Sequence, residues 1–429
     1  MDSTPESARW SLPLRLIFRL VFCYFALVNL TFPLEVLPFT GKLVSLYANA
    51  WNDGVSWVGA HILHLAQPIA EQANGSGDRL FNWVEQVCYL GYAALATLIW
   101  SILDRRRPAY LKLHQWLRIL LRYALASAML SYGILKLHKG QFPFPGPVRL
   151  LERVGELSPM GLLWTFMGYS TPYTVFSGAA ETLGGVLLFF RRTTTLGALV
   201  CAAVMTNVVL LNLSYDVPVK IYSMLLLSMA LTIAAPDLRR LLGLLVLGRA
   251  VPAADLSTPI PAGWPRAAGM VARWVVAAML VFNTTKMVRA EIERFQTQAS
   301  APLYGIWQVE EYARNGAAVP PLATDATRWN RLLVQGAEFL LVKSMTDEGL
   351  GYAYVFDAGK QTLTLSRPAD PKDAPRTVLS VARPEPDGLV LSGPMGGAAL
   401  EVKLRRVPLD SFPLVNRGFR WVNEFPFNR

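Results

Sequence analysis

The sequence predicts a membrane α-helical bundle of about seven transmembrane helices, followed by an extracytoplasmic all-β domain. Long apolar runs recur up to residue 288 and then stop. Beyond them apolar residues recur with a period of two, as in half-buried strands. Hydrophobic residues make up 53% of the chain and charged residues 17%, whereas charged residues are about a quarter of an ordinary soluble domain. Lipid is therefore the expected solvent for most of the chain.

The apolar runs have the length of membrane-spanning helices, because a hydrocarbon core about 30 Å thick requires roughly 20 apolar residues. They predict spans at residues 12–32, 83–103, 115–137, 174–190, 193–212, 217–235 and 267–288. The Leu-rich run at 238–248 is shorter and contains Arg239 and Arg240. It predicts a helix at the membrane interface rather than an eighth span.

The orientation follows from the cations, because Lys and Arg concentrate in cytoplasmic loops. Alternate loops collect the arginine clusters at 15–19, 105–107, 191–192 and 239–240. The N-terminus is therefore predicted to be cytoplasmic and the C-terminal domain extracytoplasmic. This topology and anionic lipid headgroups account for the net charge of +11. The bilayer is thus an expected partner, and nucleic acid is not.

Two motifs in the middle of the chain resemble a known family. Ser131–Leu137 closes on Gly-x-x-Lys, and Glu181–Leu188 combines a Glu, paired glycines and a Leu run ahead of the basic turn Arg191–Thr194. With two further short-looped spans, residues 119–235 resemble the four-helix DoxX/DoxD family. The resemblance implies a bacterial inner (cytoplasmic) membrane protein, in some members the small subunit of a thiosulfate:quinone oxidoreductase and in others a partner of redox-defence proteins.

Glu181 is the candidate catalytic residue, with a role in proton handling. A carboxyl inside a span is costly in lipid and normally faces protein or a wet cavity. Ser177, Gly178, Gly184 and Gly185 share its helix face and form a stripe that allows close helix packing. The alternative, which the residues leave open, is a structural hydrogen bond between helices.

The other candidate site residues are polar groups expected toward the outer half of the bundle. They are predicted to bind the substrate in an outward-facing polar pocket: Tyr132, Lys136, Gln141, Asn207, Asp216 and Lys220. Asp216 is placed to cap the sixth span and to pair with Lys220 one turn later. The alternative is that helix ends at any interface collect polar residues.

The loop between the third and fourth spans is predicted to be a rigid lip at residues 141–147, because its prolines cannot continue a helix. The aromatic residues of the following stretch, 159–173, suggest an interfacial belt or a half-inserted segment.

The C-terminal domain is predicted to be an eight-stranded antiparallel barrel. Its candidate strands are 304–313, 329–335, 338–344, 351–357, 361–366, 376–383, 387–393 and 398–406. The opening Gly305-Ile306-Trp307 resembles the Gly-x-Trp start of lipocalin-type barrels. A barrel of this size can be filled by side chains or hold one small ligand. The aromatic tail 419–429 is expected to pack on the barrel or to enter the headgroup layer.

These features divide the chain into a two-span region with an outer loop (1–114), a DoxX-like four-helix unit (115–240), an interfacial helix with the seventh span and a linker (241–300), the barrel (301–409) and the tail (410–429). The four histidines and three cysteines form no metal-binding motif, and no phosphate-binding motif is present. No intrinsic cofactor is indicated.

Two functional hypotheses follow. The first is a quinone-linked or redox-associated membrane subunit that receives electrons from a redox partner protein. The second is a non-enzymatic envelope protein that binds or passes a lipid or another hydrophobic small molecule through the bundle and barrel.

Overall fold

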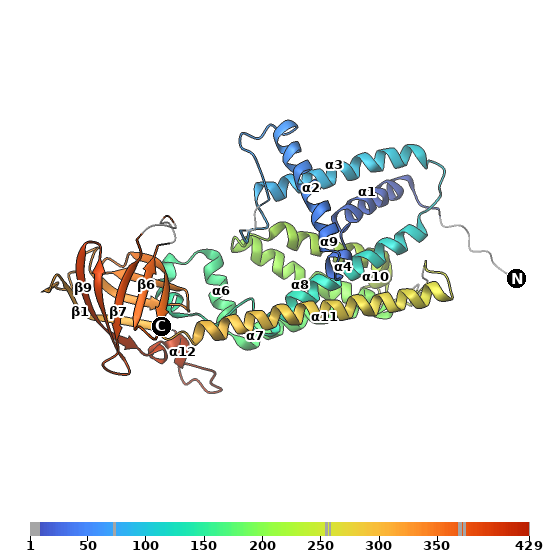
Figure 1. The fold of residues 1–429 in the computed structure, drawn as a ribbon. Coiled ribbons are helices and arrows are strands. Elements are labelled where there is room, and N and C mark those ends of the chain that lie inside the picture. The colour runs from blue at the N-terminus through green and yellow to red at the C-terminus, as the bar shows by residue number, and fades with distance from the viewer. Residues whose placement is uncertain are drawn as a thin grey trace. The chain divides into compact units, whose positions relative to one another are not determined.

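The computed structural model describes residues 9–428 except 72–73, 254–255, 257–258, 368–370 and 372–374. Its internal contacts divide the chain into two compact units (Figure 1). The first consists of Met1–Gln141 and Pro172–Val288, and the second of Phe142–Thr171 and Arg289–Arg429.

The first unit is helical. Its elements are α1 (Leu12–Val28), η1 (Leu34–Val36), α2 (Gly41–His61), α3 (Leu80–Leu103), α4 (Leu111–Leu137), α7 (Thr171–Phe189), η3 (Arg191–Thr193), α8 (Thr194–Ser214), α9 (Lys220–Ala234), η4 (Ala235–Asp237), α10 (Leu238–Leu245) and α11 (Trp264–Ala299), whose last turns belong to the second unit. A helix therefore occupies each predicted span, and α10 occupies the short run predicted at 238–248.

The chain is a membrane protein by the length and composition of its helices. Among the described residues, five helical segments are long and apolar enough to cross a membrane: Leu80–Leu103, Leu111–Leu137, Arg191–Ser214, Lys220–Leu245 and Trp264–Gln298. The predicted count of seven spans also includes α1, with 17 residues, and α7, with 19. Crossing by these two helices stays a prediction.

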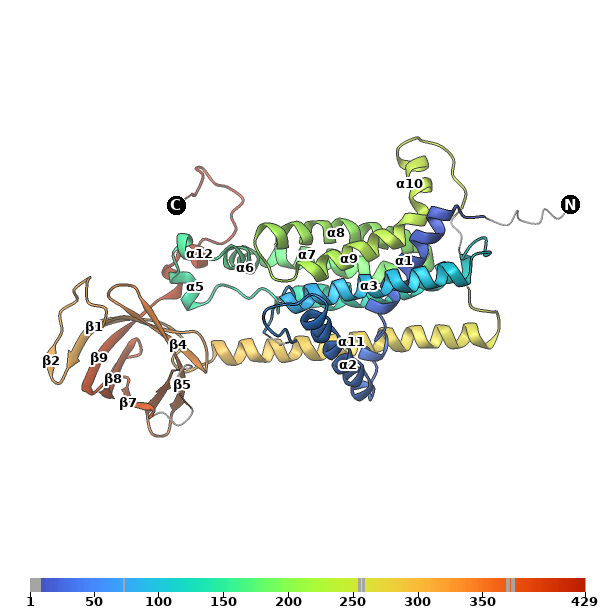
Figure 2. The ribbon, with the colours of Figure 1, turned by 90° about the horizontal axis from the view of Figure 1, so that it is seen from above.

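The core of the helical unit is centred on α4. Leu121 and Leu125 of α4 are fully buried, and they belong to one cluster with Leu188 of α7 and Met229 and Ile233 of α9. Helices α8 and α9 run side by side, as do α1 and α3 (Figures 1 and 2). Phe81, Val84 and Cys88 of α3 form a smaller buried cluster with Val55 of α2, whereas other apolar side chains of α3, such as Leu95 and Leu98, are exposed as contact with lipid requires.

The second unit contains a barrel and a separate helical segment. The segment comprises α5 (Pro147–Leu151), η2 (Val154–Glu156) and α6 (Pro159–Tyr169). The strands are β1 (Gly305–Arg314), β2 (Ala317–Ala318), β3 (Trp329–Val334), β4 (Phe339–Ser344), β5 (Gly349–Asp357), β6 (Thr362–Ser366), β7 (Thr377–Ala382), β8 (Gly388–Met395) and β9 (Ala398–Val407). The chain then forms η5 (Leu409–Ser411) and α12 (Pro413–Asn416).

The barrel is closed, antiparallel and eight-stranded, which confirms the prediction. β1 and β3 to β9 pair in chain order, and β1 closes the ring against β9, while the two-residue β2 only extends the edge of β1 (Figure 2). Closure leaves no free sheet edge. Alternate residues point inward, as in β6, where Leu363 and Leu365 are buried between partly exposed neighbours. All eight predicted strands coincide with observed ones to within two residues.

Residues 142–171 contact the barrel, although the sequence suggested only a lip and an interfacial stretch. The backbone N–H of Val148 donates a hydrogen bond to Oε1 of Gln335 at 3.2 Å. Farther along the segment, Arg153 forms an ion pair of 2.7 Å with Asp347 in the β4–β5 turn. The segment therefore runs along the outside of β3 and β4 and belongs to the barrel unit.

The aromatic tail does not pack its side chains on the barrel. Phe419, Trp421 and Phe425 are 77%, 90% and 83% exposed. Phe427 lies beside Arg417, whose guanidinium carbon is 4.5 Å from the ring centroid. The expectation of packing on the barrel is therefore wrong for residues 419–428, and Arg429 lies outside the described residues. Entry into the headgroup layer stays a prediction.

Candidate functional site

The stripe of small residues around Glu181 brings helices into backbone contact. A Cβ built on Gly178 of α7 would lie 2.7 Å from the carbonyl oxygen of Gly133 in α4. One built on Gly185 would lie 3.2 Å from the carbonyl oxygen of Ala126, and one on Gly184 would lie 2.7 Å from Sγ of Cys201 in α8. The predicted role of the stripe in close packing is therefore confirmed.

Glu181 forms a buried ion pair with Lys136 of α4. The two residues are 2% and 6% exposed. The Lys136 ammonium also lies 5.9 Å from the ring centroid of Tyr132, one turn earlier. The second carboxylate oxygen of Glu181 receives no hydrogen bond from the described residues. A charged pair sealed in this way favours the structural alternative for Glu181.

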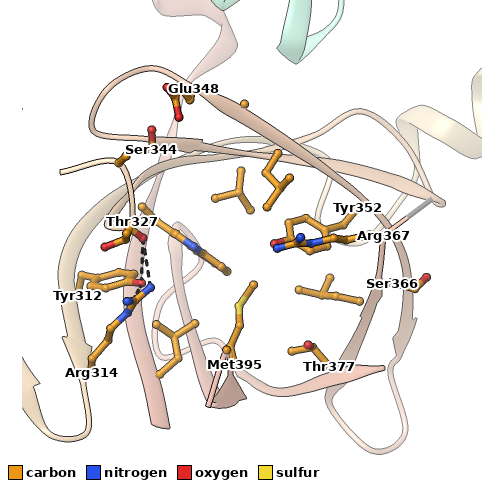
Figure 3. Close-up of a pocket in the computed structure, with 18 of the residues that line it drawn as sticks. Tyr312, Arg314, Thr327, Ser344, Glu348, Tyr352, Ser366, Arg367, Thr377 and Met395 are labelled. Atoms are coloured by element: carbon orange, nitrogen blue, oxygen red, sulfur yellow. Dashed lines mark hydrogen bonds between the residues drawn. The ribbon is translucent and has the colours of Figure 1, made fainter. Parts of the chain in front are cut away.

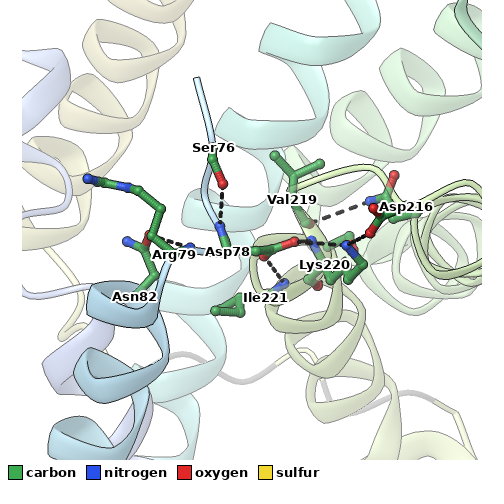
Figure 4. Close-up of polar contacts among 10 residues, drawn as sticks. Ser76, Asp78, Arg79, Asn82, Asp216, Val219, Lys220 and Ile221 are labelled. Atoms are coloured by element: carbon green, nitrogen blue, oxygen red, sulfur yellow. Dashed lines mark hydrogen bonds and ion pairs between the residues drawn. The ribbon is translucent and has the colours of Figure 1, made fainter. Parts of the chain in front are cut away.

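A second polar cluster lies at the start of α9 (Figure 4). Asp78, from the loop before α3, accepts hydrogen bonds from the backbone N–H groups of Lys220 and Ile221 at 2.8 and 3.0 Å. The Lys220 ammonium lies 2.9 Å from Asp216 and 3.7 Å from Asp78. The predicted ion pair between Asp216 and Lys220 is therefore present.

The predicted cap is wrong, because Asp78 rather than Asp216 caps α9. Asp216 has a φ of 50° and an 84% exposed side chain, so it occupies a left-handed turn position beside the helix. The first backbone N–H groups of α9 already have a carboxylate partner in Asp78. The Lys220 ammonium has two carboxylate partners, Asp216 and Asp78. This helix end is therefore neutralised from within the chain and offers little to an external anion.

The predicted site residues do not converge on one point. Tyr132, Lys136 and Glu181 form the first cluster, and Asp216 and Lys220 belong to the second. Asn207 is exposed on α8, and Gln141 follows the end of α4. Among the described residues, neither Asn207 nor Gln141 shares a hydrogen bond or ion pair with either cluster.

The barrel contains a cavity of about 400 Å³ at one end (Figure 3). Its apolar wall includes Trp329, Val342, Leu365, Met395 and Leu400. The full lining comes from the ends of β1, β4, β6 and β8 and the starts of β3, β5, β7 and β9, which all meet at the same rim of an antiparallel barrel.

The opposite end of the barrel is filled by side chains. Leu303 is fully buried, and its carbonyl oxygen accepts a hydrogen bond of 2.9 Å from Nε1 of Trp307. Tyr354 donates from its hydroxyl to the carbonyl oxygen of Gly336 at 2.5 Å, and burial raises its pKa to about 12. The barrel is therefore plugged at one end and hollow at the other, which the sequence left undecided.

Two arginines lie on opposite sides of the cavity, each beside a tyrosine (Figure 3). Arg314 donates from Nε to the hydroxyl of Tyr312 at 3.1 Å. The guanidinium carbon of Arg367 lies 5.9 Å from the ring centroid of Tyr352. Both tyrosines are buried, whereas both arginines are exposed at the rim.

None of these four residues belongs to a motif that is recognisable in the sequence. Successive side chains of a strand point to opposite faces, and this alternation along β5 is sufficient to predict that Tyr352 points into the barrel. No local pattern indicates that Arg314 and Arg367, from strands distant in sequence, share one rim.

The β2–β3 loop on the cavity rim is held by Asp325. Its Oδ1 accepts hydrogen bonds from Oγ1 and the backbone N–H of Thr327, at 2.8 and 2.7 Å, and from the N–H of Arg328 at 3.1 Å. These hydrogen bonds, led by the one from the Thr327 side chain and supported by the positive charge of Arg314, lower the pKa of Asp325 below its ordinary value. Thr327 in turn lines the cavity.

We expect this loop to loosen in acid. The pKa of Asp325 is lower in the folded protein than in the unfolded chain. The ionised carboxylate therefore stabilises the loop fully above its ordinary pKa of about 3.9, and this stabilisation is lost as the pH falls through the pKa of the folded state. Hydrogen exchange at Thr327 and Arg328 should therefore show constant protection, after correction for intrinsic rates, from pH 7 to about 5, and a loss below about 4. Asp325→Asn should remove this pH dependence. An identical acid transition in the variant would assign the change to another group.

Comparisons with known proteins place the chain in a family. No protein-family model and no solved structure matches it. The chain is 35% identical over 123 residues to the protein named "Uncharacterized protein YwoB" of Bacillus subtilis (strain 168). The alignment covers 29% of this chain and 78% of YwoB. The chain therefore belongs to the family that includes YwoB.

Proposed function

We propose that the protein is a membrane-anchored binding protein whose C-terminal barrel holds one small hydrophobic molecule. The observation that carries this proposal is the cavity of about 400 Å³ at the open end of the barrel. Binding pockets for small molecules are typically about 300–1,000 Å³ and combine apolar walls with a few polar groups. This cavity has that volume, and its lining combines apolar side chains with polar groups that make up at least as much of its surface.

The depth of the cavity suits an apolar body. Trp329, Leu365 and Leu400 lie on its wall and are at most 6% exposed. Hydroxyl groups such as that of Thr377 and the two rim arginines supply its polar part. Burying apolar surface provides affinity, at about 25 cal/mol per Å² before the costs of association.

The charge pattern supports an extracytoplasmic location of the barrel. The arginine clusters of alternate loops favour a cytoplasmic N-terminus, and seven crossings of a bacterial inner membrane would then lead to the outer side. The ligand would be taken up from the cell envelope. Protease added to spheroplasts should release barrel fragments. Full protection of the barrel until lysis would contradict this orientation.

The binding function is tested on the full chain in lipid nanodiscs, with native mass spectrometry of the molecules that remain bound. Thr377 and Val378 are adjacent on β7, but Thr377 lines the cavity and Val378 is 45% exposed on the opposite face. Thr377→Trp should fill the cavity and weaken the affinity for the bound molecule about tenfold or more, which corresponds to about 1.4 kcal/mol and is measured as a loss of occupancy. Val378→Trp is the matched control. Equal occupancy in both folded variants would place the ligand elsewhere.

A second candidate is the quinone-linked or redox-associated subunit that the DoxX/DoxD resemblance implies, with a redox partner protein as electron source. The observation that favours it is the second carboxylate oxygen of the buried Glu181, beside Lys136 and Tyr132, which receives no hydrogen bond within the part of the chain that the structure describes. A polar atom without a partner in a bundle interior is a place where a quinol hydroxyl or a transferred proton could be accepted.

This candidate predicts that purified protein contains quinone and reduces added quinone with thiosulfate or another donor. Glu181→Gln should remove turnover per molecule of folded protein, although the lost charge also leaves Lys136 without its ion-pair partner. Bound lipid or fatty acid without any turnover would favour the binding function instead.

A further inference from the structure

We infer that the ligand of the barrel is a single-chain amphiphile whose one carboxylate or phosphate group is held between Arg314 and Arg367. This inference rests on the proposed binding function and specifies the chemical class of the ligand. It is carried by the rim geometry, in which two guanidinium groups stand on opposite sides of a cavity that has an apolar part to its wall (Figure 3).

Arg314 is held in place by its neighbours. Besides the hydrogen bond from Nε to the Tyr312 hydroxyl, its Nη2 donates to the carbonyl oxygen of Thr327 at 3.4 Å. Its guanidinium carbon lies 5.6 Å from the ring centroid of Tyr312. These contacts orient the group and occupy only part of its donors, since a guanidinium carries five N–H groups.

Neither rim arginine has a carboxylate partner among the described residues. Other exposed cations of the barrel differ in this respect, because Lys403 is ion-paired with Glu311 at 2.7 Å and Arg405 with Glu310 at 2.5 Å. Glu348 also lines the cavity, but it forms no ion pair with either arginine. The described lining therefore carries two cations and one anion, and the carboxylate of Asp325 in the neighbouring loop offsets part of the charge of Arg314.

An anion at the rim completes this arrangement. Guanidinium groups bind carboxylate and phosphate oxygens through charge-assisted hydrogen bonds, which are about twice as strong as neutral ones. Below the rim the side chains of Val342, Leu365 and Leu400 give the wall an apolar part, which suits a hydrocarbon chain. At about 400 Å³ the cavity is near the lower limit for ligand pockets and suits one chain rather than the two acyl chains of a phospholipid.

The test compares three probes that share one dodecyl chain: dodecanoate, dodecyl phosphate and the neutral dodecanol. Their affinities are measured by equilibrium dialysis against the full chain in nanodiscs, and binding to nanodiscs that carry Thr377→Trp is subtracted. Both anions should bind at least about tenfold more tightly than dodecanol, since a charge-assisted hydrogen bond contributes more than about 1.4 kcal/mol. Whichever anion binds more tightly distinguishes a carboxylate ligand from a phosphate ligand.

Arg314→Gln and Arg367→Gln should each weaken binding of the anions about tenfold and leave dodecanol binding unchanged. Arg405→Gln, on the same barrel but toward the other end of β9, should change neither. Equal affinity for dodecanol and the anions, or no effect of the arginine variants, would overturn the assignment of an anionic ligand while the binding function stands. If none of the three probes binds, the binding function itself fails.

Discussion

Replacing Glu181 with Met is expected to lower the free energy of unfolding by about 3–5 kcal/mol, because it leaves the Lys136 ammonium charged and buried without a partner. The two side chains are ion-paired, and their exposures of 2% and 6% leave little access to solvent. Lys136→Met should cost a similar amount, since it strands the carboxylate. The measurement is the midpoint of SDS-induced unfolding of the full chain in mixed micelles.

The double variant Lys136→Met/Glu181→Met distinguishes the effect of an unpaired buried charge from the effect of replacing either side chain. Replacing both members of a buried ion pair by apolar residues of similar size is often neutral. The double variant should therefore recover most of the stability that either single variant loses. Additive losses in the double variant, or single variants as stable as the parent, would show that the ion pair does not hold α4 to α7.

Gly178→Ala is expected to destabilise the bundle by about 1–3 kcal/mol, the usual cost of overpacking a well-packed core. The added Cβ would lie 2.7 Å from the carbonyl oxygen of Gly133, 2.8 Å from Cβ of Lys136 and 2.9 Å from the backbone nitrogen of Leu137. Two of these atoms are backbone, so α4 and α7 must move apart. The same movement would weaken the ion pair between Lys136 and Glu181.

Gly91→Ala is the matched control for this variant. Gly91 lies inside α3, and its added Cβ would meet nothing within 4 Å. An Ala in an open helix position is favourable by up to about 1 kcal/mol relative to Gly. The SDS midpoint should therefore fall for Gly178→Ala and stay level or rise for Gly91→Ala. A similar fall in both variants would point to a general effect of helix composition instead of a close helix crossing.

The elements of this fold could be predicted because each depends on a short-range pattern. Long apolar runs locate helices such as α3, α4 and α8, and the alternation of apolar and polar residues in stretches such as 361–366 locates the strands. The stripe around Glu181 was also readable, because residues three and four apart share a helix face. Even closure of the barrel was predictable, since eight short antiparallel strands must remove their edges.

The candidate site depended on residues that only the folded chain brings together. Asp78 caps α9 although it precedes Lys220 by more than 140 residues, and local spacing had favoured Asp216. Residues 142–171 join the barrel through contacts such as that of Arg153 with Asp347, which no local pattern encodes. These residues are far apart in the sequence, and the spacing of apolar residues within one helix or strand does not indicate which distant side chains will meet.

By itself, the sequence determined that this is a membrane protein with an eight-stranded C-terminal barrel, because burial in lipid and in a barrel core imposes regular spacing on apolar residues. The tertiary structure decided that Glu181 is sealed against Lys136, that one end of the barrel is hollow, and that Arg314 and Arg367 share its rim. These are matters of which side chains meet, and side-chain packing in three dimensions is set by the whole fold.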